Sequence, residues 1–173
     1  MNPMDLANKY SRVVQLRLKS KLLENMRIIA PNLQDLEVLH VANQPVLFAT
    51  IDSQLVPLSF AGDGATTVAS ILLAIITSPG GVVCIDEFDA SIHYSTLKEV
   101  WSLIHDACVE HDVQIFAATH SRESAVALFS AVDRNSGNDV IFYRLDRVNG
   151  SSVATPYTWQ DMQEVDAEDW EIR

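Results

Sequence analysis

The sequence predicts an α/β protein with a mostly parallel sheet that is flanked by helices. Two apolar strands, Val82–Ile85 and Gln114–Ala118, alternate with helical segments, and this order is typical of parallel βαβ units. Both strands are continuously apolar, as expected of strands that are covered on both faces. With 173 residues the chain has the length of one domain, and we expect a single domain over residues 1–173.

The first part of the chain predicts a long helix followed by short strands. Apolar side chains recur at helical spacing over residues 4–29, and Pro31 stops the pattern, so residues 1–30 are assigned to an N-terminal helix. Extended segments are expected at 36–41 and 46–51, with a hairpin turn at 43–45.

A core of residues 55–132 follows. Residues 55–60 lead into Ala-Gly-Asp-Gly at 61–64, which opens an apolar helix from Ala65 to about Thr77. Beyond the first apolar strand, a helix of about 95–110 carries a continuous apolar stripe. A further helix is expected at about 121–132, directly after the second strand.

Residues 133–173 predict a hairpin and an acidic tail. A turn is expected at 135–138, and Asn149-Gly150 is a strong hairpin signal between extended segments at 140–147 and 152–156. The tail begins with a short helix for which Thr158 is the expected cap.

Charge is unevenly distributed. The net charge is −11, but six basic residues against two acidic ones give residues 1–27 a charge of +4, which leaves −15 for the rest. Overall acidity argues against direct nucleic-acid binding by this chain alone. The basic helix is read either as a solvated face or as a contact for phosphate or an acidic partner.

The composition is that of a cytoplasmic protein. Cys84 and Cys108 lie in apolar surroundings, and reduced buried thiols are favoured over a disulfide or a metal site. The first 30 residues lack the apolar region of a signal peptide. The most apolar stretch, Val68–Ile76, is shorter than the roughly 20 residues that span a bilayer, so no membrane span is expected.

Acidic side chains and a histidine follow the two apolar strands. Asp86, Glu87 and Asp89 come after the first strand, and His120 follows the second. Because chemistry collects at the carboxyl ends of parallel strands, we expect a partly desolvated acidic site that favours a cation and faces the imidazole. The alternatives are that the carboxylates only cap a turn and the next helix, and that His120 is a partly buried histidine with its hydrogen bonds made inside the fold.

The glycines are informative by presence and by absence. Gly62-Asp63-Gly64 before a helix gives exposed N–H groups, an anion-binding geometry, although a simple turn is the alternative. No glycine is followed by lysine, so the chain has no Walker A loop of the form Gly-x4-Gly-Lys-Ser/Thr, whose lysine and N–H groups hold nucleotide phosphates.

Together these motifs resemble the C-terminal half of ABC-class P-loop ATPases. The resemblance is strongest to the prokaryotic AAA-type ATP-binding proteins, relatives of RecF, the structural-maintenance-of-chromosomes (SMC) proteins and the overcoming-lysogenisation-defect ATPases. Residues 57–64 resemble the signature motif, 81–87 resemble Walker B with its catalytic glutamate, 89–93 resemble the D-loop, and 114–121 resemble the switch-histidine strand. The match covers roughly residues 50–132 and implies the C-terminal lobe of such an ATPase.

The resemblance implies Mg²⁺ and ATP as cofactors and a role for each motif residue. Asp86 would hold Mg²⁺ through water, Glu87 would polarise the attacking water, and His120 would contact the γ-phosphate. Residues 62–64 (Gly62, Asp63 and Gly64) would meet the nucleotide of the opposite subunit in a head-to-tail dimer. Ala90, Ser91 and His93 would lie at that dimer interface.

This sequence also departs from the family pattern. The N-terminal half with Walker A is not present, and Thr66 and Thr67 stand where Lys or Arg is common. We therefore expect ATP hydrolysis only when a Walker A-bearing lobe or dimer partner completes the site, with the isolated chain inactive or very weak. A nuclease or DNA-associated complex is one setting for such a partner.

Three interpretations stay open. The chain is such a half-site, or it is a degenerate ATPase remnant that acts as a protein-interaction module. A third reading is a metal-dependent phosphodiesterase that uses Asp86, Glu87, Asp89 and His120 directly.

Overall fold

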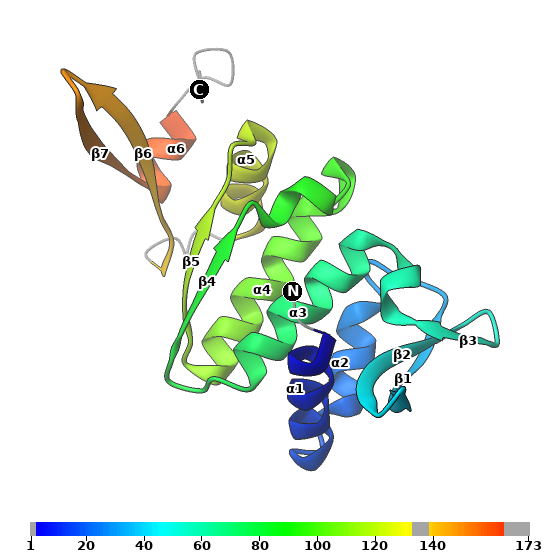
Figure 1. The fold of residues 1–173 in the computed structure, drawn as a ribbon. Coiled ribbons are helices and arrows are strands. Elements are labelled where there is room, and N and C mark those ends of the chain that lie inside the picture. The colour runs from blue at the N-terminus through cyan, green and yellow to red at the C-terminus, as the bar shows by residue number, and fades with distance from the viewer. Residues whose placement is uncertain (1–2, 133–138, 165–173) are drawn as a thin grey trace.

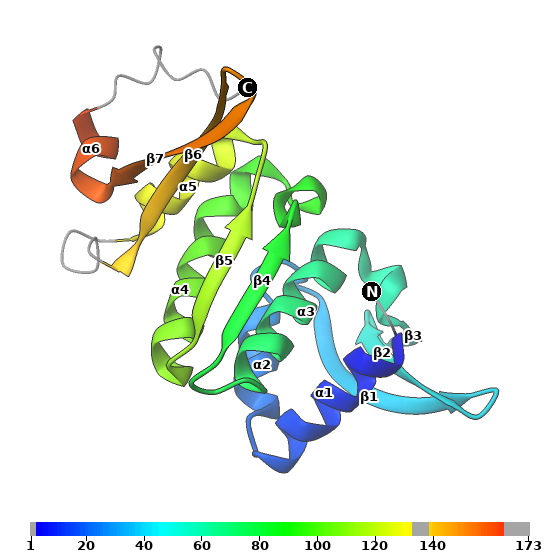
Figure 2. The same cartoon turned by 60° about the vertical axis from the view of Figure 1, so that its left-hand side comes forward.

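Helices α3 and α4 form the centre of the computed structural model, which describes residues 3–132 and 139–164. One side of these helices carries the sheet of β4 and β5, and the other carries α1, α2 and the sheet of β1–β3 (Figures 1 and 2). The helices are α1 (Pro3–Gln15), α2 (Lys19–Met26), α3 (Asp63–Ile76), α4 (Leu97–His111), α5 (Arg122–Ala131) and α6 (Trp159–Glu164). The strands are β1 (Leu33–Val41), β2 (Gln44–Ile51), β3 (Gln54–Pro57), β4 (Val82–Asp86), β5 (Gln114–Ala118), β6 (Ile141–Val148) and β7 (Ser151–Thr158).

The core forms around α3 because this helix is apolar on nearly every side. Val68, Leu72, Leu73 and Ile75 are fully buried, as expected of a helix that has neighbours all round. The apolar stripe predicted for α4 is confirmed, since Val100, Trp101 and Ile104 face the same core.

The predicted long N-terminal helix is wrong, because it breaks at Arg17. Arg17 has a φ of +59°, and its amide donates to the Val14 carbonyl while the Leu18 amide donates to Val13 (both 3.0 Å). These two bonds form a Schellman C-cap, which ends α1. The chain then turns back, so that α2 buries Leu22, Leu23 and Met26 in the core that α1 also contacts.

Sheet β1–β2–β3 is antiparallel and is built from two tight hairpins. The predicted hairpin between β1 and β2 is confirmed, although its turn residues are Ala42 and Asn43. Asp52 and Ser53 form a second hairpin turn that the sequence analysis did not predict. All four residues have positive φ, as the favoured two-residue hairpin turns require.

The expectation of a mostly parallel sheet is not confirmed. Among the described strands only β4 and β5 pair in parallel, in the register Asp86↔Ala118, and the strands of the other two sheets pair antiparallel. Coverage on both faces is also wrong. Figure 2 shows α3 and α4 behind one face of this sheet, whereas Val82 (57% exposed), Cys84 and Phe116 (56% exposed) are accessible. The strands are apolar enough to be covered twice, but the described chain supplies helices for only one face.

The predicted hairpin after α5 is confirmed as β6 and β7, joined at Asn149-Gly150. The tail helix α6 is also present, with Thr158 Oγ1 accepting from the Asp161 amide (3.3 Å) and donating to its carboxylate (2.6 Å). The turn expected at 135–138 and the acidic end of the tail lie outside the described residues. In both views the hairpin lies beyond β5, on the side away from β4 (Figures 1 and 2).

In the ranges that the structure describes, no helix combines the length and the apolarity that crossing a membrane requires.

Candidate functional site

The carboxylates after β4 stand on a sharp backbone turn. Asp86 ends the strand, and Glu87 adopts a left-handed conformation with φ 45° and ψ 39°. The Glu87 amide donates to the Ala118 carbonyl of β5 (3.1 Å), and its carbonyl accepts from the Ala90 amide (3.2 Å). The turn is therefore held by the neighbouring strand and by the short 3-10 helix Phe88–Ser91 that follows.

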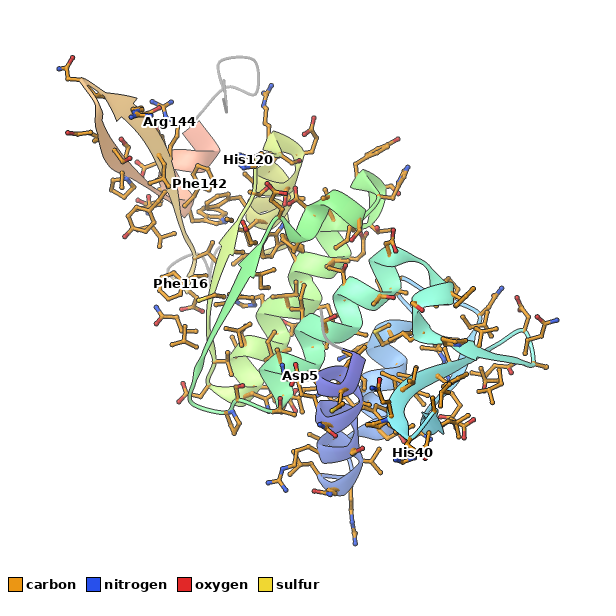
Figure 3. The ribbon with its side chains drawn as sticks, in the orientation of Figure 1. Asp5, His40, Phe116, His120, Phe142 and Arg144 are labelled. Atoms are coloured by element: carbon orange, nitrogen blue, oxygen red, sulfur yellow. The ribbon has the colours of Figure 1, made fainter. Side chains whose placement is uncertain are left out.

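The structure brings Glu87 and His120 together at the carboxyl ends of β4 and β5. His120 Nε2 lies 3.4 Å from Glu87 Oε1, and Figure 3 shows His120 at the end of β5. The side chains are 85% and 61% exposed. The expected partly desolvated acidic site is thus wrong for this chain, because Asp86 and Glu87 are both accessible to solvent. Nothing in the described chain covers the strand ends.

Asp89 makes a contact that joins the two strand ends. Thr119 Oγ1 donates to Asp89 Oδ2 (2.7 Å) and accepts from the Ser121 amide (2.9 Å). The alternative of a metal-dependent phosphodiesterase requires the side chains of Asp86, Glu87, Asp89 and His120 to surround one metal ion. Within the described residues, no group of three or more His, Cys, Asp or Glu side chains is arranged to hold a metal ion.

The start of α5 is capped from the turn that carries His120. Ser121 Oγ accepts from the Ser124 amide (3.1 Å) and donates to Glu123 Oε2 (3.1 Å). Two hydrogen bonds lower the pKa of Glu123: one from the backbone amide of Glu123 itself, and one from the Ser121 hydroxyl. A negative charge in the first turn also suits the positive end of the helix.

The predicted anion-binding segment lies at the start of α3. Gly62 precedes the helix with a φ of +102°, and Asp63 is its first residue. A Cβ at Gly64 would lie 2.9 Å from the carbonyl oxygen of Ser91, so glycine is required there for close approach. Thr67 Oγ1 and Ser91 Oγ are 2.9 Å apart, which ties the start of α3 to the loop after β4.

The residues expected at a dimer interface are accessible. Ala90, Ser91 and His93 are all exposed. His93 Nδ1 is hydrogen-bonded to Ser95 Oγ (2.8 Å), and its ring lies beside that of Tyr94, with centroids 4.4 Å apart. Tyr94 is 72% exposed, and this exposed aromatic had no signal in the sequence analysis.

The donor set at the strand ends fits Mg²⁺ held largely through water. Mg²⁺ prefers oxygen ligands and is commonly bound by one or two carboxylates together with waters and substrate phosphates. Asp86 and Glu87 supply accessible carboxylates without a closed protein cage. A separate pocket of about 310 Å³ lies between α1 and β1, lined in part by Tyr10, Val14 and Lys19, and it is not near these carboxylates.

Comparisons with solved structures identify SMC heads as neighbours. One, described under ATP-driven dimerisation and DNA-stimulated activation of SMC ATPases, is 12% identical with a TM-score of 0.58, over 90% of this chain and 93% of that chain. An Smc head bound to the C-terminal winged-helix domain of ScpA is 14% identical with a TM-score of 0.60, over 95% of this chain and 53% of that chain. An Smc head with an extended coiled coil, bound to the C-terminal domain of ScpA derived from Pyrococcus furiosus, is 13% identical with a TM-score of 0.59. That match covers 91% of this chain and 38% of that chain.

At these identities the neighbours show the fold alone. The chain spans about half and about two fifths of the two Smc heads bound to ScpA domains. No curated protein matches the sequence.

A family model described as "AAA domain, putative AbiEii toxin, Type IV TA system" matches residues 7–126. This range includes the start of α3, both strand ends and His120. The match covers more than half of the chain, and with a fold like that of SMC ATPase heads it shows an ATPase-family domain. The chain belongs to this AAA domain family.

Proposed function

We propose that this chain carries the catalytic residues of an ABC-type ATPase site and hydrolyses ATP when a Walker A-bearing lobe completes that site. The observation that carries the proposal is the Glu87–His120 pair, held 3.4 Å apart at the ends of two parallel strands. A carboxylate and an imidazole on one sheet edge suit a reaction that needs an oriented water and a contact to the transferred phosphate.

Each residue has a proposed role in the completed site. Asp86 would hold Mg²⁺ through water, and the ion would neutralise phosphate charge when bound. Glu87 would accept a hydrogen bond from the attacking water and polarise it. His120 would donate to the γ-phosphate, and its contact with Glu87 would orient both side chains.

The sequence lacks the Walker A loop that would hold the nucleotide phosphates, and this limits what the chain can do alone. Positioning and charge neutralisation supply most of phosphoryl-transfer catalysis. The sequence has no glycine-lysine loop to bind the β- and γ-phosphates. Isolated chain should therefore bind ATP poorly and release phosphate slowly, whatever the quality of the Glu87–His120 pair.

The open side of β4 and β5 is the proposed docking place for the completing lobe. A Walker A loop follows the carboxyl end of a strand, so its strand must run parallel to β5 to bring the loop to the edge that carries His120. The edge of β5 away from β4 has no described strand beside it, and it faces the side where the β6–β7 hairpin lies (Figure 2). A strand of the completing lobe would pair with this edge at the usual spacing of about 4.8 Å. Figure 3 shows Phe116 projecting from β5 on the uncovered face, where the lobe would bury it.

The experiment combines this chain with a lobe that carries a glycine-lysine loop, sought first in the gene beside its own. We expect Mg²⁺-dependent phosphate release by the pair that neither part shows alone. Glu87→Gln should reduce this release at least about 100-fold, because it removes the base that orients water. Glu99→Gln, at an exposed position in the first turn of α4, is the matched control and should leave the rate unchanged.

Alkylation of Cys84 reports docking separately from catalysis. Cys84 is exposed on β4, so a bound lobe should slow its reaction with a maleimide. Protection together with phosphate release that Glu87→Gln leaves unchanged would refute the assigned role of Glu87. No release by the wild-type pair despite protection would refute the ATPase proposal.

The start of α3 is proposed to act across a dimer. Gly62, Asp63 and Gly64 would meet the nucleotide of the opposite subunit, and Ala90, Ser91 and His93 would line the contact, in line with their exposure. The nearby aromatic side chain of Tyr94 is also accessible. A nuclease or DNA-associated complex, in the cytoplasm, is the setting that we propose for this assembly.

The open apolar face also favours a second candidate, a protein-interaction module without catalysis. Val82 and Phe116 are more than half exposed on a parallel pair, and parallel strands are normally covered on both faces. Isothermal titration separates the candidates. A half-site should bind Mg²⁺-nucleotide once the lobe is present, whereas a remnant should bind the lobe alone.

A further inference from the structure

One threonine ties together the two turns that carry Glu87 and His120. Thr119 Oγ1 donates to Asp89 Oδ2 (2.7 Å) and accepts from the Ser121 amide (2.9 Å). The first bond crosses from the turn after β5 to the loop after β4. The second fixes the backbone on the far side of His120. A hydroxyl can donate once and still accept, so a single group serves both contacts.

The loop of residues 87–91 is attached on its other side as well. Ser91 Oγ lies 2.9 Å from Thr67 Oγ1 on α3, and the Ser91 carbonyl lies against Gly64. At the near end, Glu87 is held in a left-handed conformation that a non-glycine residue adopts only under constraint. Two side-chain contacts, the Thr119–Asp89 bond and the Glu87–His120 pair, join this loop to the turn after β5.

We propose that Thr119 is a positioning residue, which holds His120 beside Glu87 through Asp89 and does not touch substrate. This inference rests on the proposed function, because that function assigns the Glu87–His120 pair to hydrolysis. Hydrogen bonds to a charged group are stronger than those between neutral groups. Without the hydroxyl, Asp89 and the Ser121 amide both lose their partner, and the loop and the turn are free to separate.

The test is amide hydrogen exchange, measured residue by residue by NMR on the whole chain without nucleotide or completing lobe. In Thr119→Val we expect the Ser121 amide to exchange about tenfold faster. The amides of Glu87 and Ala90, which hold the turn after β4, should also exchange faster. Thr119→Ser keeps the hydroxyl and should restore all three rates.

Thr77→Val is the matched control, because it removes a threonine hydroxyl that donates to the Leu73 carbonyl (2.6 Å) at the other end of α3. It should leave the amides of Glu87, Ala90 and Ser121 unchanged. A Thr119→Val effect confined to Ser121 would mean a local cap and would overturn the positioning role.

If Thr119→Val does not fold, Asp89→Ala tests the same bond from the other side. It should speed exchange at Glu87 and Ala90 while Ser121 keeps its bond to Thr119, and unchanged exchange at Glu87 would overturn the inference. The readout does not depend on ATP hydrolysis. A completed site without ATPase activity would therefore refute the proposed function and leave the exchange result to decide the role of Thr119.

Discussion

A glutamate in the left-handed region stands at the centre of the candidate site. Glu87 has a φ of 45°, and this conformation costs a non-glycine residue about 1–2 kcal/mol. Strained residues of this kind cluster at functional sites, where surrounding contacts hold them. Here the Ala118 carbonyl and the Ala90 amide supply those contacts. The sequence pattern placed Glu87 after a strand, and the left-handed backbone there sets the direction of its carboxylate.

At the residue scale, Cys108 gives the chain an alkaline pH dependence. Burial raises the pKa of its thiol from an ordinary value of 9.0 to about 11, so between these values the thiolate forms only in the unfolded chain. The unfolded state then loses protons that the native state keeps, and stability falls as pH rises. We expect the free energy of unfolding to fall by up to about 2–3 kcal/mol between pH 9 and 11 from this group.

The comparison is urea unfolding of the wild type and Cys108→Ala across that pH range. Burial also raises the pKa of Tyr10, so both proteins lose stability above pH 10, but the variant should have the shallower profile. Equal slopes would show that Cys108 does not titrate differently in the two states.

Sequence patterns placed Asp86, Glu87 and His120 at strand ends because an apolar run followed by polar side chains marks where a strand stops. The Thr119–Asp89 bond could not be predicted in the same way. It depends on the register that sets Asp86 opposite Ala118, and register is a property of two strands together. The sequence around Asp86, Glu87 and His120 also did not predict that nothing in the described chain covers these side chains.

At the scale of elements, the break between α1 and α2 shows why apolar spacing alone misjudged a helix. Leu6, Tyr10 and Val13 face the core from α1, and Leu22, Leu23 and Met26 face it from α2. Two short helices that bury the same kind of stripe are hard to distinguish from one long helix. The stop signal was a backbone conformation at Arg17, a residue with good helix propensity.

Arg17→Gly should stabilise the chain. Glycine takes up a positive φ without the steric cost that Arg17 bears, and we expect a gain of about 0.5–1 kcal/mol in the free energy of unfolding after the entropy of glycine is allowed for. Arg12→Gly, within α1, is the control and should cost about 1 kcal/mol. Urea midpoints measure both, and a loss at Arg17 would show that its side chain outweighs the strain.

The parallel pair teaches the opposite lesson about elements. Continuous apolar strands correctly predicted β4 and β5 and the order of their helices. They did not predict the exposure of Phe116. An apolar composition indicates that both faces of a strand are suited to burial, but it does not say whether the same polypeptide provides the covering layer. The turn at Asn149-Gly150 was easier, since both residues readily adopt the positive φ that it requires. Ala42 and Asp52-Ser53 carry no comparable preference, so the first hairpin turn was expected at 43–45 and the second was missed.

At the scale of the whole molecule, the β6–β7 hairpin is loosely joined to the rest. Its side-chain contacts to the described core include the Trp159 Nε1–H bond to the Val132 carbonyl (3.3 Å) and His105 Nε2, which lies 3.9 Å from Asp139 Oδ2. Ile141, Tyr143 and Leu145 on β6 are at least half exposed. The family match ends at residue 126, before this hairpin begins.

We expect hydrogen exchange to show the hairpin opening at a lower free energy than α3, because Ile141, Tyr143 and Leu145 are at least half exposed whereas α3 is buried in the core. Trp159→Phe should speed exchange in β6 and β7 several-fold through loss of one hydrogen bond, and leave α3 unchanged. Equal protection in the hairpin and α3 would mean that the two unfold as one unit.

The packing of Trp101 has an optical consequence. Its ring lies 4.5 Å from that of Phe88, edge to face, and its indole N–H donates to the Ser124 carbonyl (2.9 Å). Phe88 begins the 3-10 helix after Glu87, and Ser124 lies in the first turn of α5. With Trp159 and Trp170 replaced by phenylalanine, this indole would be the sole tryptophan emitter, and its fluorescence would register movement at either strand end.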